Sequence, residues 1–341
     1  MTLNTKTLNL SAKEFKSDQE VKWCPGCGDY AILVAVQKAM PELGIPRENY
    51  AVISGIGCSS RFPYYMNTYG FHSIHGRAAA IATGVKLAKP ELSVWQITGD
   101  GDALAIGGNH FIHEIRRNVD INILLFNNEI YGLTKGQFSP TSKTGAKTKT
   151  SPHGTVERPF HPGQLVMGAN GTFFARALDT NIKHTTEVMI QAAQHKGASV
   201  VEILQNCVIY NDKTHAAITD REHKDDRQLL LEHGKPMLFG KKKEKGLRLR
   251  GLELEIVEIG RDGVTLDDIL VHDAKTANPA LHWMLASMEA PEFPVAFGVI
   301  RAYETPSFED NVAHQIAEQQ ESSPIRCMDD LLFSGTTWAV N

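Results

Sequence analysis

Residues 92–132 read LSVWQITGDGDALAIGGNHFIHEIRRNVDINILLFNNEIYG and contain two apolar runs that each lead directly into a polar motif. The runs Leu92–Thr98 and Ile121–Phe126 are short and rich in branched apolar residues, as buried parallel strands are. The first leads into Gly-Asp-Gly-Asp at 99–102 and the second into Asn-Asn at 127–128. The stretch therefore predicts two buried strands of an α/β sheet, with a polar motif at the carboxyl end of each.

The same pattern continues on both sides of this stretch. Tyr50–Ser54 and Ser199–Leu204 are further strand candidates. Helical spacing of apolar residues lies between the strand candidates, at 29–40, 77–88, 103–117 and 184–195. Alternation of strands with helices predicts an α/β fold, a parallel sheet with helices on both faces.

Two segments interrupt the alternation. Residues 131–163 are rich in Gly, Ser, Thr and Pro without periodicity, and a loop of this length inside a compact domain is usually functional or mobile. Residues 211–251 are strongly polar. We therefore expect an N-terminal extension over 1–22, an α/β domain over 23–225 and a smaller C-terminal extension over 226–341.

The composition is that of an ordinary soluble globular protein: 341 residues, 42% of them hydrophobic, with 35 Lys and Arg against 39 Asp and Glu. A formal net charge of −4 provides no overall attraction for nucleic acid or an anionic membrane. The N-terminal residues have no apolar signal core, and no later run approaches the ~20 apolar residues of a spanning helix. We expect a cytoplasmic protein without a membrane or nucleic acid partner.

The Gly-Asp-Gly motif suits a diphosphate bound through magnesium. Its glycines let the backbone approach phosphate closely, and the carboxylate of Asp100 is a ligand that Mg²⁺ prefers. Asn128 adds an amide oxygen and Ile130 a backbone carbonyl. The amides at the start of the helix expected from Ala103 would face the phosphates. Each motif alone is more often an ordinary turn, but two at neighbouring strand ends indicate a site.

The five cysteines are unevenly spaced in a sequence without the marks of a secreted protein, so we expect no disulfide framework. Cys24 and Cys27 form a C-x-x-C pair, while Cys58, Cys207 and Cys327 stand apart. This spacing is not that of a zinc ribbon. Taken alone, the C-x-x-C pair is compatible with a redox dithiol or with zinc.

Gly-Asp-Gly followed by Asn-Asn resembles the thiamine diphosphate motif of thiamine-dependent enzymes. The wider sequence resembles the β subunit of 2-oxoacid:ferredoxin oxidoreductases over about residues 20–225, and within that family most of all the 2-oxoglutarate type. The motifs that carry this resemblance are WCPGCG at 23–28, GIGCSSR at 55–61, HGRA at 75–78, GDGD at 99–102, NNEIYGLTKGQ at 127–137 and the region of Cys207. The fold that it implies is the diphosphate-binding type of thiamine-binding domain.

The resemblance implies three cofactors: thiamine diphosphate, Mg²⁺ and one [4Fe-4S] cluster. The implied Mg²⁺ ligands are Asp100, Asn128 and Ile130. The implied cluster ligands are Cys24, Cys27, Cys58 and Cys207, and Cys327 is expected to be an inert thiol. The residues implied to bind thiamine diphosphate are Ile56, Gly57, Cys58, Ser59, His75, Gly99, Gly101, Asp102, Gly132 and Leu133.

The resemblance also implies four catalytic residues. His75 and Arg77 would meet the diphosphate or the substrate, although a histidine beside an arginine is commonly only a surface feature. Arg61 and Lys135 would hold the carboxylates of a dicarboxylate such as 2-oxoglutarate. Ordinary solvated side chains are the alternative for both cations.

The implied reaction is the coenzyme A-dependent oxidative decarboxylation of 2-oxoglutarate, or the reverse, a reductive carboxylation of succinyl-CoA that fixes CO₂. Electrons would pass through the [4Fe-4S] cluster to ferredoxin. A member of the same family specific for pyruvate or another 2-oxoacid is the nearer alternative. The more distant alternatives are a non-redox thiamine-dependent decarboxylase and a zinc-binding protein without enzymatic activity.

A partner subunit is expected, because thiamine enzymes need a glutamate beside the aminopyrimidine and only one α/β domain is visible in this sequence. The resemblance implies an α subunit, or a fused α/γ subunit, that carries the pyrimidine-binding domain in a heterooligomer. The basic run 235–250 is ordinarily a solvated face. Its alternative role is a positive patch that attracts an acidic ferredoxin.

Overall fold

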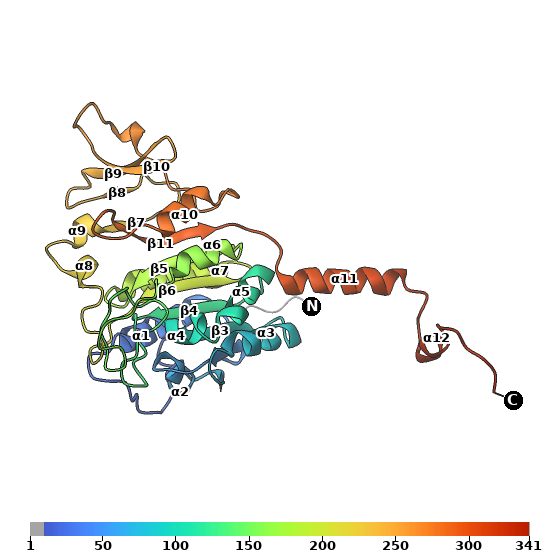
Figure 1. Cartoon of the computed structure of the whole chain (residues 1–341). Helices are drawn as coiled ribbons and strands as arrows, with labels where there is room; N and C mark the ends of the chain where they lie inside the picture. The colour runs from blue at the N-terminus through green and yellow to red at the C-terminus, as the bar shows by residue number, and fades with distance from the viewer. Residues whose placement is uncertain (1–9, 341) are drawn as a thin grey trace.

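The computed structural model describes residues 10–340; residues 1–9 of the expected N-terminal extension, and residue 341, lie outside the described part. The centre of the protein is an eight-stranded sheet in the order β2-β1-β3-β4-β6-β5-β11-β7 (Figure 1). Its strands are β1 (Tyr50–Ser54), β2 (Tyr69–His72), β3 (Ser93–Gly99), β4 (Asn122–Asn127), β5 (Phe173–Leu178), β6 (Ser199–Leu204), β7 (Gln228–Leu230) and β11 (Val295–Ala302). The first six strands of this order are parallel, whereas β11 pairs antiparallel with β5.

The four predicted strands are confirmed as β1, β3, β4 and β6, each within one residue of its expected bounds. All four are buried along nearly their whole length, which is why apolar runs revealed them. The mostly parallel sheet of an α/β fold is likewise confirmed. Sequence reasoning did not find β2, β5, β7 or β11.

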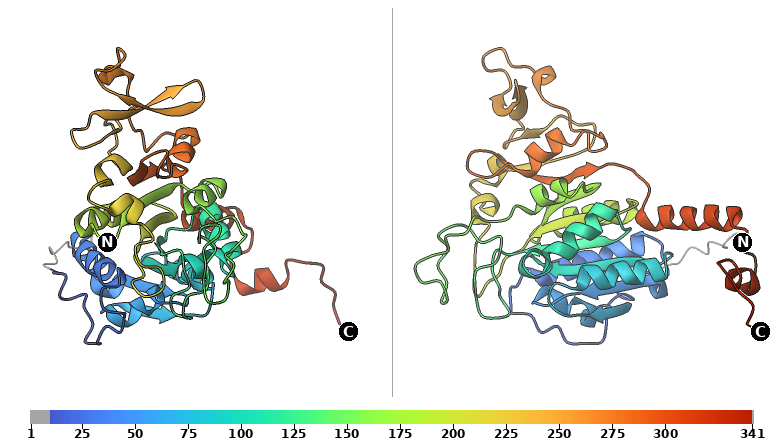
Figure 2. Two further views of the ribbon diagram at one scale, coloured as in Figure 1. Left: turned by 60° about the vertical axis from the view of Figure 1, so that its left-hand side comes forward. Right: turned by 45° about the vertical axis from the view of Figure 1, so that its right-hand side comes forward.

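Helices cover both faces of the sheet (Figures 1 and 2). α1 and α7 pack together on one face, and α3, α5, α6 and α10 lie on the other. The helices are α1 (Asp29–Glu42), α2 (Phe62–Tyr65), α3 (Ala78–Ala88), α4 (Asp100–Leu104), α5 (Gly108–Arg117), α6 (Pro162–Gly168), α7 (Ile182–Gln194), α8 (Ala216–Thr219), α9 (Lys224–Arg227), α10 (Ala280–Ala286), α11 (Phe308–Ser322) and α12 (Met328–Leu332). The helices predicted at 29–40, 77–88 and 184–195 are confirmed as α1, α3 and α7.

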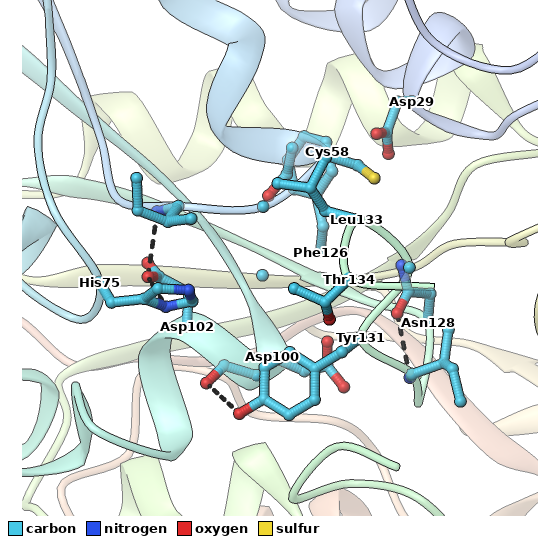
Figure 3. Close-up of a pocket in the computed structure, with 17 residues that line it drawn as sticks. Asp29, Cys58, His75, Asp100, Asp102, Phe126, Asn128, Tyr131, Leu133 and Thr134 are labelled. Atoms are coloured by element: carbon cyan, nitrogen blue, oxygen red, sulfur yellow. Dashed lines mark hydrogen bonds and ion pairs between the residues drawn. The ribbon is translucent and has the colours of Figure 1, made fainter. Parts of the chain in front are cut away.

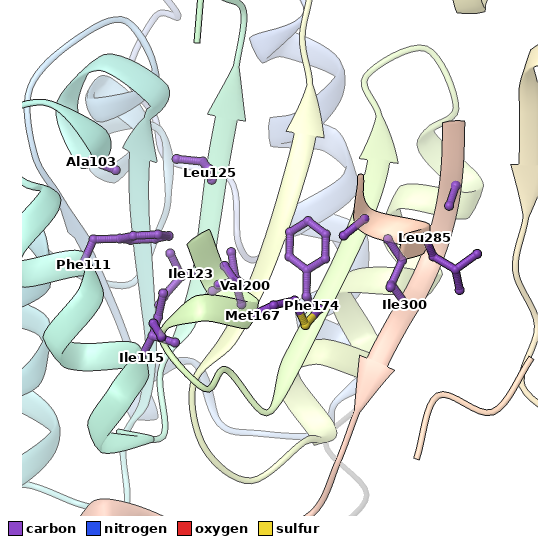
Figure 4. Close-up of a cluster of buried hydrophobic side chains, with 14 of the residues drawn as sticks. Ala103, Phe111, Ile115, Ile123, Leu125, Met167, Phe174, Val200, Leu285 and Ile300 are labelled. Carbon is purple, nitrogen blue, oxygen red and sulfur yellow. The ribbon is translucent and has the colours of Figure 1, made fainter. Parts of the chain in front are cut away.

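Two apolar clusters fill the space between the sheet and its helices. One joins Phe111 and Ile115 of α5 to Ile123 and Leu125 of β4, and extends to Leu285 of α10 (Figure 4). The other joins α1 and α7 to the opposite face of the same sheet. Because successive side chains of a strand point to opposite faces, the continuous apolar run of β4 supplies both clusters.

The single helix expected over 103–117 is wrong, because the structure has two helices there. α4 begins within the Gly-Asp-Gly motif, and α5 begins after a turn at Ala105–Gly107. A Cβ atom on Gly107 would lie 2.9 Å from Gly76 Cα and 2.4 Å from the carbonyl oxygen of Asp102. This close packing of backbone against backbone interrupts the helix and brings the loop at Gly76 next to the Gly-Asp-Gly motif.

The residues after 225, predicted as a C-terminal extension, contribute to two sheets. β7 and β11 belong to the central sheet, while β8 (Leu238–Phe239), β9 (Lys245–Arg250) and β10 (Glu253–Glu258) form a small sheet at one end of the molecule (Figure 1). α11 and α12 extend away from the body of the protein (Figure 1). Within residues 10–340, no helix has both the length and the apolar character needed to span a membrane.

Candidate functional site

The chain leaves the carboxyl ends of two neighbouring strands in opposite directions. From β1 it continues to β2 on one side, and from β3 it continues to β4 on the other. Open α/β sheets bind ligands at such a point, in the crevice outside the strand ends. A pocket lies there, between the loop after β1 and the motif after β3 (Figure 3).

All the residues predicted to bind thiamine diphosphate line this pocket. They are Ile56, Gly57, Cys58, Ser59, His75, Gly99, Gly101, Asp102, Gly132 and Leu133. The three predicted Mg²⁺ ligands, Asp100, Asn128 and Ile130, line it as well. The fold thus brings together motifs that are far apart in the sequence.

Asp102 joins the segments that form the pocket wall. Its Oδ1 accepts hydrogen bonds from the backbone N–H groups of Ile56 (3.0 Å) and Gly76 (2.8 Å), and its Oδ2 accepts one from Thr98 Oγ1 (2.7 Å). His75 Nδ1 lies 3.4 Å from the same Oδ1 (Figure 3). Because these donors occupy the buried carboxylate, Asp102 holds the two loops in place around the pocket.

Asp100 is buried beside the pocket and is held by the segment predicted as a long loop. Ser139 Oγ donates a hydrogen bond to Asp100 Oδ2 at 2.6 Å, and Thr141 Oγ1 donates to the same oxygen. Burial raises the pKa of Asp100 to about 6, because the charged carboxylate loses its hydration. A divalent cation beside this carboxylate would offset that cost, so the position suits a metal ligand.

The turn after β4 directs polar groups toward the same pocket. Glu129 adopts a left-handed φ of 56° there. Asn128 Oδ1 accepts a hydrogen bond from the backbone N–H of Ile130 at 3.1 Å, and Asn128 Nδ2 donates one to Gln205 Oε1 at 2.8 Å. These two contacts fix the orientation of the Asn128 side chain beside the pocket (Figure 3).

Four cysteines approach one another next to the pocket. They are Cys24, Cys27, Cys58 and Cys207, which come from three loops far apart in the sequence. A Cβ atom on Gly132 would lie 3.4 Å from Cys207 Sγ and 3.6 Å from Cys58 Sγ. These two sulfur atoms therefore flank the backbone just after the Asn-Asn turn.

The C-x-x-C loop packs against the loop of Cys207. A Cβ atom on Gly26 would lie 3.6 Å from Val208 Cγ1, and Gly26 has a φ of +81°. The N–H of Cys27 donates to the carbonyl of Cys24 at 3.0 Å and closes the turn. Cys327 lies in the exposed segment before α12, apart from this group.

Three of the four cysteines are partly buried and Cys24 is exposed, and aromatic rings lie beside Cys58. Trp23 Nε1 donates to the carbonyl oxygen of Cys58 at 2.7 Å, and the ring of Tyr65 packs edge-on against Trp23. Burial raises the pKa of Cys58 to about 12; burial first, and then the nearby carboxyl group of Asp29, raises the pKa of Cys27. A metal that replaces the thiol proton would offset this cost at Cys27 and Cys58.

Among residues 10–340, no three His, Cys, Asp or Glu side chains lie close enough together to share one metal ion. A single tetrahedral zinc ion needs its ligands about 2 Å from one centre. Thiolates around an iron–sulfur cluster bind different irons and are farther from one another. Cys58 Sγ and Cys207 Sγ lie near Gly132 and come from separate loops, as ligands of one cluster can.

Only one of the two predicted catalytic residues of the His-Gly-Arg motif lines the pocket. His75 lines the pocket, whereas Arg77 does not. Arg77 Nη1 instead donates to the carbonyl oxygens of Gly76 (3.3 Å) and Ile106 (3.5 Å). Arg77 therefore supports the turn between α4 and α5, next to the pocket wall.

Arg61 and Lys135, the predicted carboxylate-binding residues, lie differently. Arg61 lines a cleft that shares Ile56, Gly57 and Leu133 with the pocket, so it lies at the pocket mouth. Lys135 is exposed, with a φ of 78°, and lines neither the pocket nor this cleft. Of the two cations, Arg61 is the better placed to contact a ligand that enters the pocket.

Sequence reasoning missed four residues that line the pocket: Asp29, Phe126, Tyr131 and Thr134. Asp29 is buried, its Oδ2 has no hydrogen-bond partner within residues 10–340, and burial raises its pKa to about 7. An acidic residue directly after Cys-Gly was the one available signal for it. Nothing in the sequence distinguished Phe126 from an ordinary strand residue.

The basic run 235–250 lies at the opposite end of the molecule from α2 and the loop of Cys58 (Figures 1 and 2). It forms β8, the exposed turn at 241–243 and β9. Lys245 pairs with Asp226 and Arg248 with Glu255. This placement favours the interpretation as a solvated face.

Comparisons with known proteins agree with the site. The family model described as thiamine pyrophosphate enzyme, C-terminal TPP binding domain, matches residues 55–203, which include both polar motifs. The chain is 49% identical to the 2-oxoglutarate oxidoreductase subunit KorB of Mycobacterium tuberculosis (strain ATCC 25618 / H37Rv), over 96% of this chain and 88% of that protein.

More distant relatives belong to the same group. The chain is 48% identical to the 2-oxoglutarate synthase subunit KorB of Archaeoglobus fulgidus, over 54% of this chain and 69% of that protein. Its structure is similar to that of a 2-oxoglutarate:ferredoxin oxidoreductase from Magnetococcus marinus with 2-oxoglutarate, coenzyme A and succinyl-CoA bound. That match has a TM-score of 0.78 at 31% identity and covers 97% of this chain and 98% of the other.

Proposed function

The chain belongs to the family of β subunits of 2-oxoacid oxidoreductases, and from this premise we propose that it is the thiamine-binding subunit of a 2-oxoglutarate:ferredoxin oxidoreductase. The proposed reaction is the coenzyme A-dependent oxidative decarboxylation of 2-oxoglutarate, or its reverse from succinyl-CoA. One observation carries the proposal: the diphosphate motif, the Asn-Asn turn and Cys58 line one pocket.

The residues of the pocket fit thiamine diphosphate and Mg²⁺. The bound cofactor supplies the electron sink for loss of CO₂ from a 2-oxoacid. Asp100, the amide oxygen of Asn128 and the carbonyl of Ile130 would hold Mg²⁺, an ion that prefers oxygen ligands. The absence of a side chain at Gly99 and Gly101 lets the backbone come close to the diphosphate.

The four converging cysteines would hold the [4Fe-4S] cluster. Cys58 belongs both to this group and to the pocket lining, so a cluster bound there would lie next to the cofactor. A non-redox decarboxylase needs no electron acceptor beside its cofactor. The position of Cys58 therefore favours an oxidoreductase.

Arg61 and His75 would act on the substrate. Arg61 would bind the second carboxylate of 2-oxoglutarate at the pocket mouth through a charge-assisted pair, which pyruvate lacks. Asp102 orients the imidazole of His75 through Nδ1, which leaves Nε2 available to hold or move a proton near the substrate. Lys135 is proposed to act on the substrate from the exposed rim of the pocket. Arg77 is proposed to act indirectly, by supporting the turn between α4 and α5.

A partner subunit is proposed to cover the pocket mouth and to supply the pyrimidine-binding domain. Several large apolar side chains are exposed on α2, on β2 and on the loops around the pocket. They are Tyr64, Tyr69, Phe71, Ile74, Ile106 and Leu133. Exposed apolar surface of this kind marks a protein interface.

The composition of the purified complex tests the proposal. This chain, co-purified anaerobically with its partner subunit, should contain thiamine diphosphate and about four irons per chain. Its visible absorption should bleach with 2-oxoglutarate plus coenzyme A, and less with pyruvate, and ferredoxin should then be reduced. The isolated chain should be inactive. Thiamine without iron would identify a non-redox decarboxylase, and zinc in place of iron and thiamine would contradict the proposal.

Replacing single cysteines tests the cluster site. Cys58→Ser should lose most of the bound iron, because serine is a poor replacement for a thiolate ligand. Cys327→Ser is the matched control and should keep the full iron content, because Cys327 lies apart from the group. Iron and sulfide analysis with electron paramagnetic resonance measures both. Retention of all the iron by Cys58→Ser would refute the assignment of this ligand.

A further inference from the structure

We propose that Gln205 is a positioning residue that couples the cluster ligand Cys27 to the magnesium ligand Asn128. This inference rests on the proposed function, since it concerns residues that would hold the cluster and the metal. Gln205 itself does not line the pocket, and it does not line the cleft that contains Arg61. Its side chain links a cysteine sulfur to the side chain of Asn128, whereas Asn211 links the backbone of Cys207 to the backbone of the Asn-Asn turn.

The sheet places Gln205 between the two groups. β6 lies between β4 and β5, and Gln205 directly follows β6 at its carboxyl end. Its N–H donates to the carbonyl of Asn127 at 2.9 Å, which continues the ladder of the sheet into the Asn-Asn turn. The residue is only 1% exposed, so its amide must find partners inside the protein.

Each end of the Gln205 amide has a different partner. Nε2 lies 3.3 Å from Cys27 Sγ and 2.7 Å from the carbonyl oxygen of Asn206. Oε1 accepts from Asn128 Nδ2 at 2.8 Å. Both N–H groups and the oxygen are thus used, and a flipped amide would place its oxygen against the Asn206 carbonyl, so only one orientation satisfies all three contacts.

The packing around Gln205 holds its side chain in this position. A Cβ atom on Gly28 would lie 2.9 Å from Gln205 Cγ, so the C-x-x-C loop approaches the glutamine closely because residue 28 has no side chain. The backbone N–H of Gly28 also donates to the carbonyl of Asn206 at 3.3 Å. The loop that carries Cys27 is therefore anchored directly to the end of β6.

Two consequences follow from the contacts. A hydrogen bond to a ligand sulfur stabilises the more negative, reduced state of an iron–sulfur cluster and so raises its reduction potential. The contact to Asn128 holds the amide group of that residue, and outer contacts of this kind orient metal ligands. Through Cys27, Gln205 would thus favour reduction of the cluster. Through Asn128, it would favour binding of Mg²⁺.

Two substitutions separate these consequences. Gln205→Leu removes both contacts, whereas Gln205→Glu keeps an oxygen that can accept from Asn128 but removes the donor to Cys27. Gln164→Leu is the matched control, because Gln164 donates to Ser287 Oγ and lines neither the pocket nor the cysteine group. All three are made in the complex with the partner subunit.

The measurements are the cluster midpoint potential, from a redox titration followed by electron paramagnetic resonance, and the affinity for thiamine diphosphate with Mg²⁺ in the cofactor-stripped complex. Both Gln205 variants should have a lower potential than the wild type. Gln205→Leu should also bind the cofactor about 10- to 100-fold more weakly, and Gln205→Glu much less so. Gln164→Leu should match the wild type in both.

Iron content, measured first, distinguishes the possible failures. A wild-type complex without iron would contradict the proposed function, whatever Gln205 does. A Gln205→Glu complex with full iron and an unchanged potential would overturn the inference and leave the proposed function standing. If Gln205→Leu does not assemble, Gln205→Glu and Gln205→Asn carry the test, since each keeps a polar side chain there; unchanged potentials in both would overturn it.

Discussion

Gly101 lies where the pocket floor meets an aromatic ring. Tyr131 OH donates to the carbonyl of Gly101 at 3.0 Å, and a Cβ atom on Gly101 would lie 2.2 Å from the Tyr131 ring (Figure 3). Tyr131 immediately follows the Asn-Asn turn and its predicted ligand Ile130. Any side chain at Gly101 therefore has to displace the Tyr131 ring, which is next to the turn that would hold the metal.

Gly101→Ala should weaken binding of thiamine diphosphate with Mg²⁺ by at least about tenfold, because the displaced ring moves the metal-binding turn. Titration of the cofactor into the stripped complex measures this. Gly108→Ala is the control, since a Cβ atom there meets nothing within 4 Å. Equal affinities in the two variants would show that the Tyr131 contact is unimportant for binding.

Among individual residues, those that line the pocket could be predicted from the sequence where they belong to short continuous motifs. Asp100 and Asn128 directly follow apolar strands, so their position at the sheet edge follows from the strand order. Asp29 and Gln205 could not be predicted in the same way. Their surroundings depend on how the C-x-x-C loop packs against the end of β6, a contact between residues far apart in the sequence.

At the scale of elements, β3 and α5 are joined by a buried polar contact. Gln96 Nε2 donates to Glu114 Oε1 at 3.0 Å, while Gln96 Oε1 and Glu114 Oε2 have no partner within residues 10–340. Burial raises the pKa of Glu114 well above its ordinary value of 4.5. The folded protein therefore binds a proton there that the unfolded chain releases above about pH 4.5.

Because the folded-state pKa is raised, the stabilisation from this proton is complete below pH 4.5 and is lost as the pH rises toward the folded-state pKa. Glu114→Gln should remove this loss. As the pH rises from acidic to neutral, the free energy of unfolding of the variant should therefore increase by about 1–3 kcal/mol relative to that of the wild type. Urea unfolding at several pH values measures it. Glu318→Gln on the exposed α11 is the control; parallel profiles for wild type and Glu114→Gln would refute the account.

Two of the four strands that sequence reasoning missed, β5 and β2, differ from the predicted strands in identifiable ways. β5 contains Arg176, whose Nε donates to Glu202 Oε2 at 2.7 Å inside the sheet, and this charge interrupts its apolar run. β2 lies at the sheet edge and is exposed, so it has no apolar run to detect. The predicted strands, by contrast, are buried on both faces.

At the scale of the whole molecule, the exposed side chains of β2 predict where the partner subunit binds. Phe71→Asp should weaken association with the partner by roughly tenfold or more, since truncation of a buried interface aromatic is costly. Analytical ultracentrifugation of the mixed subunits measures the affinity. Leu252→Asp, at a more exposed apolar site in the turn between β9 and β10 of the small sheet, should leave it unchanged. The opposite pattern would place the interface on the small sheet.

The basic turn at 241–243 should not guide ferredoxin. At physiological ionic strength, charges act over about 8 Å, and this turn lies at the other end of the molecule from the Cys58 loop (Figure 1). The triple variant Lys241→Glu, Lys242→Glu and Lys243→Glu should reduce ferredoxin as fast as the wild type in steady-state assays. A several-fold slower rate that recovers with salt would instead identify the turn as a docking site.

The position of β11 also determines when the sheet becomes complete during synthesis. β5 pairs on one side with β6, but its other edge is covered only by β11, which lies near the end of the chain. A growing polypeptide that has not reached Val295–Ala302 therefore carries an open strand edge, although all the residues of the cofactor pocket have already been made. Open edges invite pairing with other chains, so the nascent protein depends on chaperone protection, or on rapid completion, during this interval.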